Sequence, residues 1–576
     1  GARTVYYDDT ATSLADLDAT DAVAGVLQAD FAAADVEETK TLIKWLRGQD
    51  VFDEDLDDDF TDGRRWYMAS ALHSRPFPIN YGARGSFTRA NPEIVVAVGT
   101  NDGMMRLIRN TPVGHAGGAQ TGASYGEELW AFTPRSTLSA SEKLTRTNRG
   151  LPSFGIQPPY GVDGAPVVYV EENGDGTIQS GEKVWLFFGL RRGGEAYYGM
   201  DISDPENPDL LWRIDAGDTG FEELAYTFST PTVGRVKLGG TETPVVIFGG
   251  GYDLAYDSGA PTVGDGNAVF VVNAQSGDLI HKFTDADMLD SIASPVSGVD
   301  LNGDGFLDRL VVGDMGGNVW RMDMPPSAAT TGDWTINRLA SLGRRDATCS
   351  GEFADCGQDR RFFHAPDIVP FRDQSGDYDA VVIGSGNRAR PLGTTTENYM
   401  FMIKDREVST LTAPETGSVV PKNFDELRDI TSCTSASSTC TEGDIATGWK
   451  LGLTAGGEKS LASPVTLSGI VFFTSFLPPG STDLDDACVP PEGEGRLYAV
   501  GLAEGNALVN RDRPIDEQES PGEPEDRWEK LASAGIPAEV VSLPPKFILR
   551  PDLTVQEYPG RQRWRTFWYK EEDPGQ

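Results

Sequence analysis

The sequence predicts an all-β protein, a β-propeller of about seven blades with long insertions, preceded by a short helical N-terminal segment. From about residue 70 onward, short runs of β-branched and aromatic residues alternate with Gly-rich turns. These runs form copies of one unit: a strand opened by a small residue and Pro, a central apolar strand, a tight turn and an outer strand. Repeated antiparallel units of this kind are the sequence signature of propeller blades.

Six copies of this unit are clear in the sequence. Their central strands are "IVVAVGT" (94–100), "VWLFFGL" (184–190), "VVIFGGG" (245–251), "LVVGD" (310–314), "AVVIGSG" (380–386) and "IVFFTSF" (470–476). The copies lie farther apart than the roughly 40–45 residues of a compact repeat, so the blades must carry long insertions. We expect "FILRPDL" (547–553) and "RWRTFWYK" (563–570) to close a seventh blade together with N-terminal strands. Two stacked β-sandwiches are the alternative architecture, which fits the repeat less well.

The first part of the chain differs from the rest. Residues 35–47 carry apolar side chains at the spacing of one helix, with Asp35 as its N-cap. The run "DEDLDDDFTD" (53–62) then breaks this pattern and is typical of a solvated acidic loop. We therefore divide the chain into an N-terminal segment with one helix and an acidic loop, residues 1–69, and a propeller domain, residues 70–576.

Charge restricts the class of partner. The 576 residues include 49 Lys and Arg against 88 Asp and Glu, which gives a formal net charge of −39. A field of this sign repels phosphate backbones, so we expect no nucleic-acid partner. It suits a solvated acidic surface or affinity for divalent cations. No run of 18 apolar residues is present, so we expect no transmembrane segment. Gly1 is not a natural start, which indicates a processed or truncated product.

Four of the five cysteines stand in two pairs. Cys349 and Cys356 flank one short polar loop, and Cys433 and Cys440 flank another. Loops of this kind can close as disulfides in an oxidising compartment, which favours an extracytoplasmic protein. A zinc site fits less well, because both spacings are longer than those of zinc ligands. Cys488 is left over, either free or paired with a residue of a missing segment.

The stretch "DLNGDGFLDRL" (300–310) places many oxygens on a turn between two predicted strands. Calcium takes six to eight oxygen ligands, which an EF-hand-type loop supplies from positions 1, 3, 5, 7 and 9. Counted from the first Asp, those positions are Asp300, Asn302, Asp304, the Phe306 carbonyl and Asp308. Gly305 takes the sharply turning position 6, and we expect Leu307 at position 8 to anchor the loop. Because no Glu follows at position 12, the pattern predicts a shortened, nine-residue calcium (Ca²⁺) site; the alternative is an Asx-rich turn without metal.

A second calcium loop is predicted in "EENGDGTIQSGE" (171–182). Gly176 stands at position 6 and Ile178 at position 8. The tentative ligands at positions 1, 3, 5, 7, 9 and 12 are Glu171, Asn173, Asp175, Thr177, Gln179 and Glu182. A polar hairpin tip without metal is the alternative. The acidic run 53–62 lacks Gly at position 6, so we assign it no metal.

Signals of catalysis are weak. The letters "GASYG" (122–126) match the nucleophile elbow, but that motif needs a strand before it and a helix after it, and neither is indicated here. The four His are far apart in the sequence. We therefore predict that the protein is not an enzyme and has no catalytic residue.

Several segments resemble the PilY/PilC family of type IV pilus tip proteins. They are "ALHSRPFPINYG" (71–82), "VVAVGTNDGMMRLI" (95–108), "TPVVIFGGGYD" (243–253), "ASPVSGVDLNGDGFLDRLVVGDMGGNVWRMDM" (293–324) and "VVIGSGNR" (381–388). The resemblance runs from about residue 35 to the end of the chain. It implies a quinoprotein-like propeller, with calcium bound at Asp300, Asn302, Asp304 and Asp308. The N-terminal adhesive region of full-length family members is not among these residues, and no Arg-Gly-Asp triplet is present.

The resemblance also implies a function. It predicts a fimbrial protein that supports type IV pilus biogenesis and twitching motility, opposes pilus retraction and mediates cell adhesion. The expected partners are minor pilins at the pilus tip and a host or abiotic surface. The expected location is extracellular, at the pilus tip or bacterial cell surface, after export through the periplasm. The alternatives are a periplasmic quinoprotein-like oxidoreductase and a carbohydrate-binding propeller.

Overall fold

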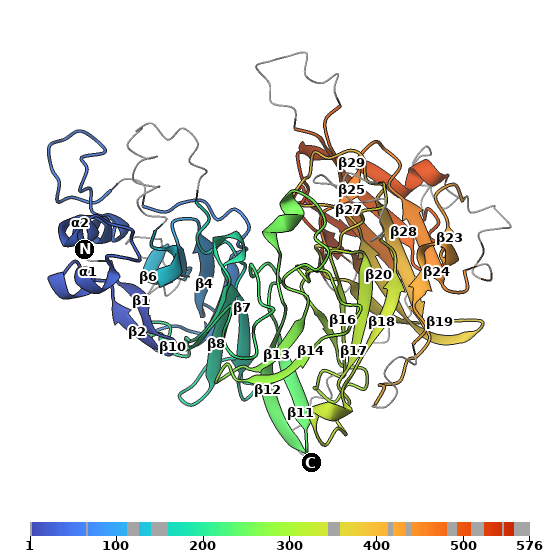
Figure 1. Ribbon diagram of the computed structural model, residues 1–576, viewed down its shortest axis with the longest axis horizontal. Helices are drawn as coiled ribbons and strands as arrows, with labels where there is room; N and C mark the ends of the chain where they lie inside the picture. Colours follow the sequence, from blue (N-terminus) through green and yellow to red (C-terminus); the bar gives the residue numbers. More distant parts are fainter. Residues whose placement is uncertain are drawn as a thin grey trace. The chain divides into compact units, whose positions relative to one another are not determined.

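The computed structural model describes most of the chain (Figure 1). The described ranges are 3–64, 67–111, 126–139, 159–343, 357–412, 419–433, 445–480, 492–508, 523–543 and 547–557, together with residues 441 and 443. They divide into two compact units. Unit 1 comprises Gly1–Gly234, Thr243–Asp253 and Asp265–Lys282, and unit 2 comprises Arg235–Glu242, Leu254–Gly264 and Phe283–Gln576. The domain boundary predicted between residues 69 and 70 does not coincide with a boundary between these units, and it stays a prediction.

Unit 1 contains two sheets that lie wholly within it. The first has six strands in the order β2-β1-β6-β5-β4-β3. Its strands are β1 (Val5–Thr10), β2 (Ser13–Asp16), β3 (Phe77–Gly82), β4 (Glu93–Thr100), β5 (Met104–Arg109) and β6 (Glu127–Thr133). The second sheet has four strands in the order β10-β9-β8-β7. Its strands are β7 (Val167–Glu171), β8 (Lys183–Gly189), β9 (Ala196–Asp201) and β10 (Asp209–Asp215).

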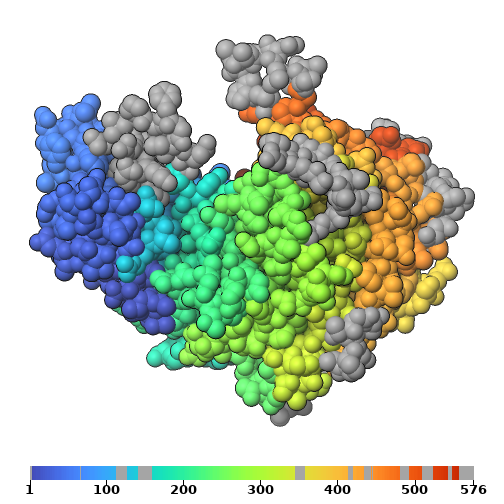
Figure 2. Space-filling view, viewed as in Figure 1, coloured from blue at the N-terminus to red at the C-terminus, as the bar shows by residue number. Residues whose placement is uncertain are grey.

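A third sheet, in the order β11-β12-β13-β14, completes unit 1. Its strands are β11 (Thr232–Leu238), β12 (Thr241–Gly249), β13 (Val269–Asn273) and β14 (Leu279–Phe283). The tip of its first hairpin, Arg235–Glu242, groups with unit 2. In the space-filling view the sequence colours form contiguous bands within each unit, as expected when consecutive sheets are built from consecutive stretches of chain (Figure 2).

Unit 2 contains four further sheets. Their orders are β15-β16-β17-β18-β22, β19-β20-β21-β24-β23, β25-β27-β28-β29 with β26 also on β27, and β30-β31-β32. The first two are built from β15 (Ser297–Val299), β16 (Arg309–Gly313), β17 (Asn318–Asp323), β18 (Thr335–Ser341), β22 (Lys422–Asn423), β19 (Asp367–Asp373), β20 (Gly376–Gly384), β21 (Tyr399–Asp405), β23 (Arg428–Asp429) and β24 (Gly448–Gly452). The last two are built from β25 (Lys459–Ser460), β26 (Val465–Leu467), β27 (Ile470–Leu477), β28 (Glu494–Gly501), β29 (Trp528–Ala534), β30 (Val541–Leu543), β31 (Phe547–Leu549) and β32 (Val555–Glu557).

The central strands of the predicted repeat are the buried strands of these sheets. Every residue of β16 is buried, as are six of the seven residues of β8 and seven of the eight residues of β27. A strand covered on both faces has no solvent side, so its sequence is a continuous apolar run rather than an alternation. This burial explains why the central strands stood out in the sequence.

Tryptophans of β6, β10 and β24 join neighbouring sheets of the same unit. In unit 1, Trp130 of β6 donates its indole N–H to Pro205 O at 2.9 Å, and Trp212 of β10 donates to Ala274 O at 2.9 Å. In unit 2, Trp449 of β24 donates to Leu502 O at 2.8 Å. Each indole is buried, and its N–H donates to a carbonyl that belongs to the next sheet along the chain or to a loop of that sheet. We therefore interpret these tryptophans as structural.

The N-terminal segment contains the predicted helix and a second one. The predicted helix is α2 (Val36–Leu46), and the Asp35 side chain caps it by accepting from Glu38 N at 2.8 Å. The additional helix, α1 (Asp21–Leu27), is capped by Thr20. The prediction of a single helix was wrong because α1 is short and rich in small residues, so it shows little periodicity. Both helices share a core with β1 (Figure 1).

The predicted closure of a seventh blade was wrong in its partners. Among the described strands, β1 pairs in parallel with β6, and β2 pairs with β1. Strand β31, from "FILRPDL", pairs with β30 and β32, its neighbours in the sequence. Short connections cost less entropy to close than distant ones, which favours this local three-stranded sheet. The segment 563–570 lies outside the described residues.

No helix in the described part of the chain is both long enough and apolar enough to cross a membrane.

Candidate metal centre

The predicted calcium loop, residues 300–308, joins two antiparallel strands of unit 2. It leaves β15 after Val299 and enters β16 at Arg309, and these two residues are register partners. Gly303 and Gly305 have φ angles of 77° and 87°, a left-handed conformation that side chains other than glycine rarely adopt. The two glycines therefore allow the chain to turn tightly enough to direct several side-chain oxygens inward.

Backbone amides of the loop donate to its own side-chain oxygens. Asp300 accepts from Gly303 N at 2.6 Å, from Asp304 N at 3.2 Å and from Gly305 N at 2.8 Å. Asn302 accepts from Asp304 N at 2.8 Å, and Asp304 accepts from Phe306 N at 3.0 Å. Carboxylates that accept from successive amides hold a loop in a fixed curve. The conformation of the loop is therefore stabilised by hydrogen bonds between its own polar groups, and its first and last residues, Asp300 and Asp308, both carry carboxylates.

Asp308, the last predicted ligand, is the most constrained carboxylate of the loop. Its side chain is 1% exposed. Oδ2 accepts from Leu301 N at 2.8 Å, whereas Oδ1 is buried without a hydrogen-bond partner among the described residues. Burial raises the pKa of Asp308, and the negative charges of Asp304 and Asp300 raise it further. A buried, unsatisfied oxygen facing like charges is costly, and a bound cation would relieve that cost.

Phe306 anchors the loop, and not Leu307 as the sequence suggested. Phe306 is buried, while Leu307 is only half-buried. The guanidinium of Arg235 and the ammonium of Lys237 lie 5.4 Å and 5.3 Å from the centroid of the Phe306 ring. Leu307 N also donates to Arg235 O at 2.8 Å. The position-7 residue is therefore held by two cations of the hairpin tip that groups with unit 2, a contact between distant segments that loop spacing does not reveal.

The second predicted loop, residues 171–182, joins β7 to β8 in unit 1. Glu182 closes it, accepting from Asn173 N at 2.9 Å and from Gln179 N at 2.7 Å. Ile178 is buried and its N–H donates to Tyr81 O at 3.1 Å, so position 8 anchors this loop as expected. The predicted ligands Glu171, Asn173, Asp175 and Gln179 are exposed, and Thr177 and Glu182 are half-buried. The structure thus brings these side chains onto one hairpin tip that faces solvent.

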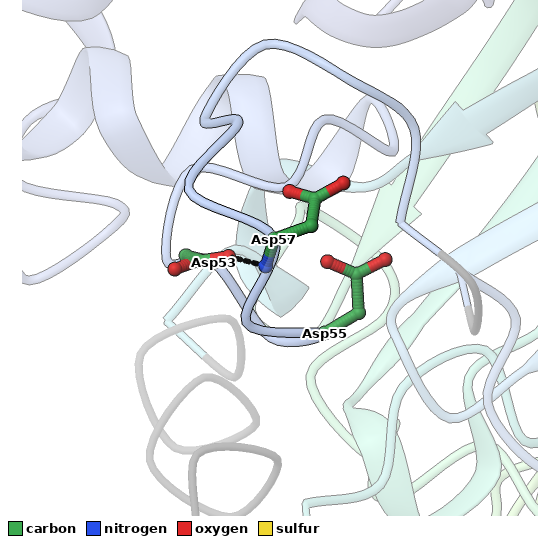
Figure 3. A group of neighbouring side chains, drawn as sticks. All are labelled: Asp53, Asp55 and Asp57. Atoms are coloured by element: carbon green, nitrogen blue, oxygen red, sulfur yellow. Dashed lines mark hydrogen bonds between the residues drawn. The ribbon is translucent and has the colours of Figure 1, made fainter.

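The acidic loop at 53–62 holds three carboxylates that sequence reasoning set aside. Asp53, Asp55 and Asp57 are the one group of three among the described residues whose candidate ligand atoms all lie within 4.8 Å of one another (Figure 3). Asp57 N donates to Asp53 Oδ1 at 2.9 Å. Asp58 stands where a calcium loop has Gly and adopts a φ of 65°. The missing Gly was thus a poor reason to dismiss the turn, although exposed acidic groups often gather without a metal.

The remaining candidates are a serine, a histidine and the cysteines. Ser124 of "GASYG" lies outside the described residues. His73 is paired through Nδ1 with the buried carboxylate of Asp163 at 2.7 Å, which supports a structural role. Cys433 is disulfide-bonded, while the other four cysteines lie outside the described residues.

Comparison with known proteins identifies the fold. Residues 67–341 match the family model described as the PilY1 beta-propeller domain. The structure is similar to the crystal structure of the Pseudomonas aeruginosa PilY1 C-terminal domain, with a TM-score of 0.53 and 19% sequence identity over 81% of this chain and 93% of that one. The predicted β-propeller is therefore confirmed.

Sequence relatives point the same way. The type IV pilus biogenesis factor PilY1 of Pseudomonas aeruginosa is 31% identical over 232 residues, which cover 40% of this chain and 17% of that protein. A PilY1 homolog of Xylella fastidiosa is 22% identical over 461 residues, which cover 72% of this chain and 26% of that protein. The chain thus matches only a minor part of the length of these relatives. The resemblance to the PilY/PilC family is confirmed, and residues 67–341 match the PilY1-type β-propeller of that family.

Proposed function

We propose that this chain is the propeller part of a calcium-binding, non-enzymatic type IV pilus biogenesis factor. The observation that carries the proposal is the match of residues 67–341 to the PilY1 beta-propeller domain, because the predicted calcium loop lies inside the matched region. The curated relatives are themselves named as pilus biogenesis factors, a name that describes no catalysis. The role supports pilus assembly, opposes retraction and mediates adhesion to a host or abiotic surface.

Calcium in this proposal binds the loop at 300–308. The ligands are the side chains of Asp300, Asn302, Asp304 and Asp308 with the carbonyl of Phe306. The unsatisfied Oδ1 of Asp308 supports a cation at this point. Without a bidentate Glu the loop offers few protein ligands, so we expect an affinity near that of extracellular calcium modules, with a Kd of about 10⁻⁴–10⁻³ M.

The second loop, residues 171–182, is proposed as a weaker calcium site. Its carboxylates Glu171, Asp175 and Glu182 are largely solvated, and none of them is buried without a partner. A cation gains less there than at Asp308, because solvated carboxylates must give up water to bind it. Calcium should therefore fill the loop at 300–308 first.

The proposed location is the pilus tip or bacterial cell surface, reached after export through the periplasm, with minor pilins as the partners there. The disulfide at Cys433 supports an oxidising compartment. The net charge of −39 suits partners other than nucleic acid.

Calcium titration of the purified chain tests the metal assignment. Asp304→Ala should abolish the tighter binding event and its thermal stabilisation. The matched control is Asp377→Ala, which removes an exposed carboxylate that pairs with Arg372 in another hairpin of unit 2 and should bind like wild type. Equal calcium uptake by Asp304→Ala and wild type would refute the assignment.

The pilus role needs a cellular assay. In cells that depend on this protein for type IV pili, deletion should reduce surface pili, twitching and attachment, and wild type should restore all three. We expect Asp304→Ala to restore assembly but to disturb the balance between extension and retraction, with Asp377→Ala again as the control. Full piliation and attachment after deletion would contradict the proposal.

A further inference from the structure

Two buried arginines of unit 2 hold the chain segment that follows β21. We call residues 406–411 the strap. Arg309 donates through Nη2 to Glu407 O at 2.9 Å and to Ser409 O at 2.8 Å. Arg321 donates to the same two carbonyls, through Nη1 to Glu407 O and through Nη2 to Ser409 O, both at 2.8 Å. The backbone carbonyls of Glu407 and Ser409 therefore each accept hydrogen bonds from both guanidinium groups.

The guanidinium groups are fixed by buried carboxylates. Asp323 lies between them, accepting from Arg309 Nε at 3.1 Å and from Arg321 Nε at 2.7 Å. Asp379 accepts from Arg309 Nη1 at 2.5 Å, and Asp405 accepts from Arg321 Nη1 at 2.7 Å. All five side chains are buried. Charge-assisted bonds in a buried site leave little freedom, so the two arginines move with the strands that carry them.

The strap itself has few other fixed points. Glu407, Val408 and Ser409 are exposed, and Val408 shows 41% of its surface to solvent. Arg406 is held at the start by Asp373, and Leu411 is buried at the end. Glu407 N also donates to Asp405 Oδ1 at 3.1 Å, so the exposed middle of the strap is held by the two arginines and by the Asp405 carboxylate that Arg321 binds.

Arg309 directly follows the last predicted calcium ligand. Asp308 N donates to Val299 O at 2.9 Å, and Asp308 O accepts from Met324 N at 2.7 Å. Arg309 is the register partner of both Val299 and Asp323. Asp308 and Arg309 are thus adjacent rungs of one ladder, and a change in the position of Asp308 is passed to Arg309 through the backbone.

We propose that the strap is the responding element of the calcium loop. Calcium at Asp308 fixes the start of β16 and thereby Arg309, which holds the carbonyls of Glu407 and Ser409. Loss of calcium leaves one buried oxygen of Asp308 unsatisfied, loosens the start of β16 and frees the strap. The metal thus controls an exposed surface segment that is distant from it in the sequence. The inference rests on the proposed calcium site.

Hydrogen–deuterium exchange of the whole chain, with calcium and with chelator, tests this coupling. Peptides of the loop 300–308 and of the strap should both exchange more slowly with calcium, the strap by at least about threefold. The internal control is the β26–β27 hairpin, residues 465–471, which belongs to a different sheet from the two arginines and should not change. A protected loop beside an unchanged strap would overturn the coupling and leave the calcium site intact. If neither peptide responds, the calcium site itself is refuted, and the coupling falls with it.

The Arg309→Lys variant tests the contact between Arg309 and the strap separately from calcium binding. Lysine keeps a charge near Asp379 but cannot serve both carbonyls, so the variant should bind calcium within about threefold of wild type while its strap no longer responds. A strap that still responds fully in Arg309→Lys would overturn the assigned route. If the variant fails to fold, the wild-type comparison decides alone.

Discussion

Replacement of Asp308 by Asn should change stability in opposite directions with and without calcium. In wild type without metal, the Asp308 carboxylate is buried, one of its oxygens has no hydrogen-bond partner in the described structure, and Asp300 and Asp304 add like charge. A neutral amide of the same shape avoids most of this cost. An unsatisfied buried polar group costs about 1–3 kcal/mol, so we expect Asp308→Asn to raise the free energy of unfolding in chelator by about 1–2 kcal/mol.

In calcium, the free energy of unfolding should instead be higher for wild type than for Asp308→Asn. A ligand present at 100 times its Kd stabilises the folded state by about 2.7 kcal/mol, and the variant should lose nearly all of this gain. Wild type should therefore be the more stable form in saturating calcium by about 0.7–1.7 kcal/mol. At about 2–4 °C per kcal/mol for a domain of this order of size, the two melting curves should exchange places by several degrees.

Thermal and urea unfolding in chelator and in saturating calcium measure this exchange. Asp377→Asn should behave like wild type in both buffers, since that carboxylate is exposed and distant from the loop in sequence. If Asp308→Asn is less stable in both buffers and gains as much from calcium as wild type, then Asp308 is not a ligand, and its burial has a purely structural cause.

Three further outcomes follow from the described contacts. Lys237→Gln removes a cation beside Phe306 and should tighten calcium binding about fourfold at low salt, estimated for a unit charge about 10 Å from a divalent ion in water; calcium titrations in low and high salt check this, and equal affinities of the variant and wild type at low salt would contradict it. Burial raises the pKa of Asp314 from 3.8 to about 7, and the Asp290 carboxylate adds to the rise, so the folded state binds the extra proton and stability should fall as the pH rises from about 4 to about 7. Urea unfolding over that range should show a shallower fall for Asp290→Asn, and an unchanged slope would exclude the pair as the cause. Trp449→Phe should cost about 1–3 kcal/mol in urea unfolding, because it leaves a buried carbonyl of the next sheet without its donor; no loss would mean that the indole N–H contributes nothing.

Local patterns in the sequence predicted local structure well. Asp35 caps its helix because an N-cap depends on neighbours within one turn. The spacing of Asp300, Asn302 and Asp304 predicted a polar loop that turns sharply at Gly305, and the structure has such a turn, with φ of 87° at that glycine. These features need no information from distant parts of the chain.

Features of the site that depend on distant segments were not predictable. The burial of Phe306 under Arg235 and Lys237 requires β11 to lie beside the loop, about 70 residues away in sequence. The link from Arg309 to Glu407 spans 98 residues. In the same way, the closing strands were assigned to distant partners because the pattern of one strand does not say which edge it meets.

In the proposed calcium loop, low affinity is compatible with a switching role. The loop lacks a bidentate Glu, and two cations lie over its position-7 residue, so both features weaken binding. At the affinity proposed for this site, calcium would fill it only at the high levels found outside cells. Weak binding nevertheless changes a structure when the empty state is itself unfavourable, and Asp308 makes it so. In the proposed coupling, a change in the position of Asp308 moves the next residue, Arg309. Arg309 belongs to a buried ion cluster that has few alternative arrangements, so its movement changes the position of the exposed strap.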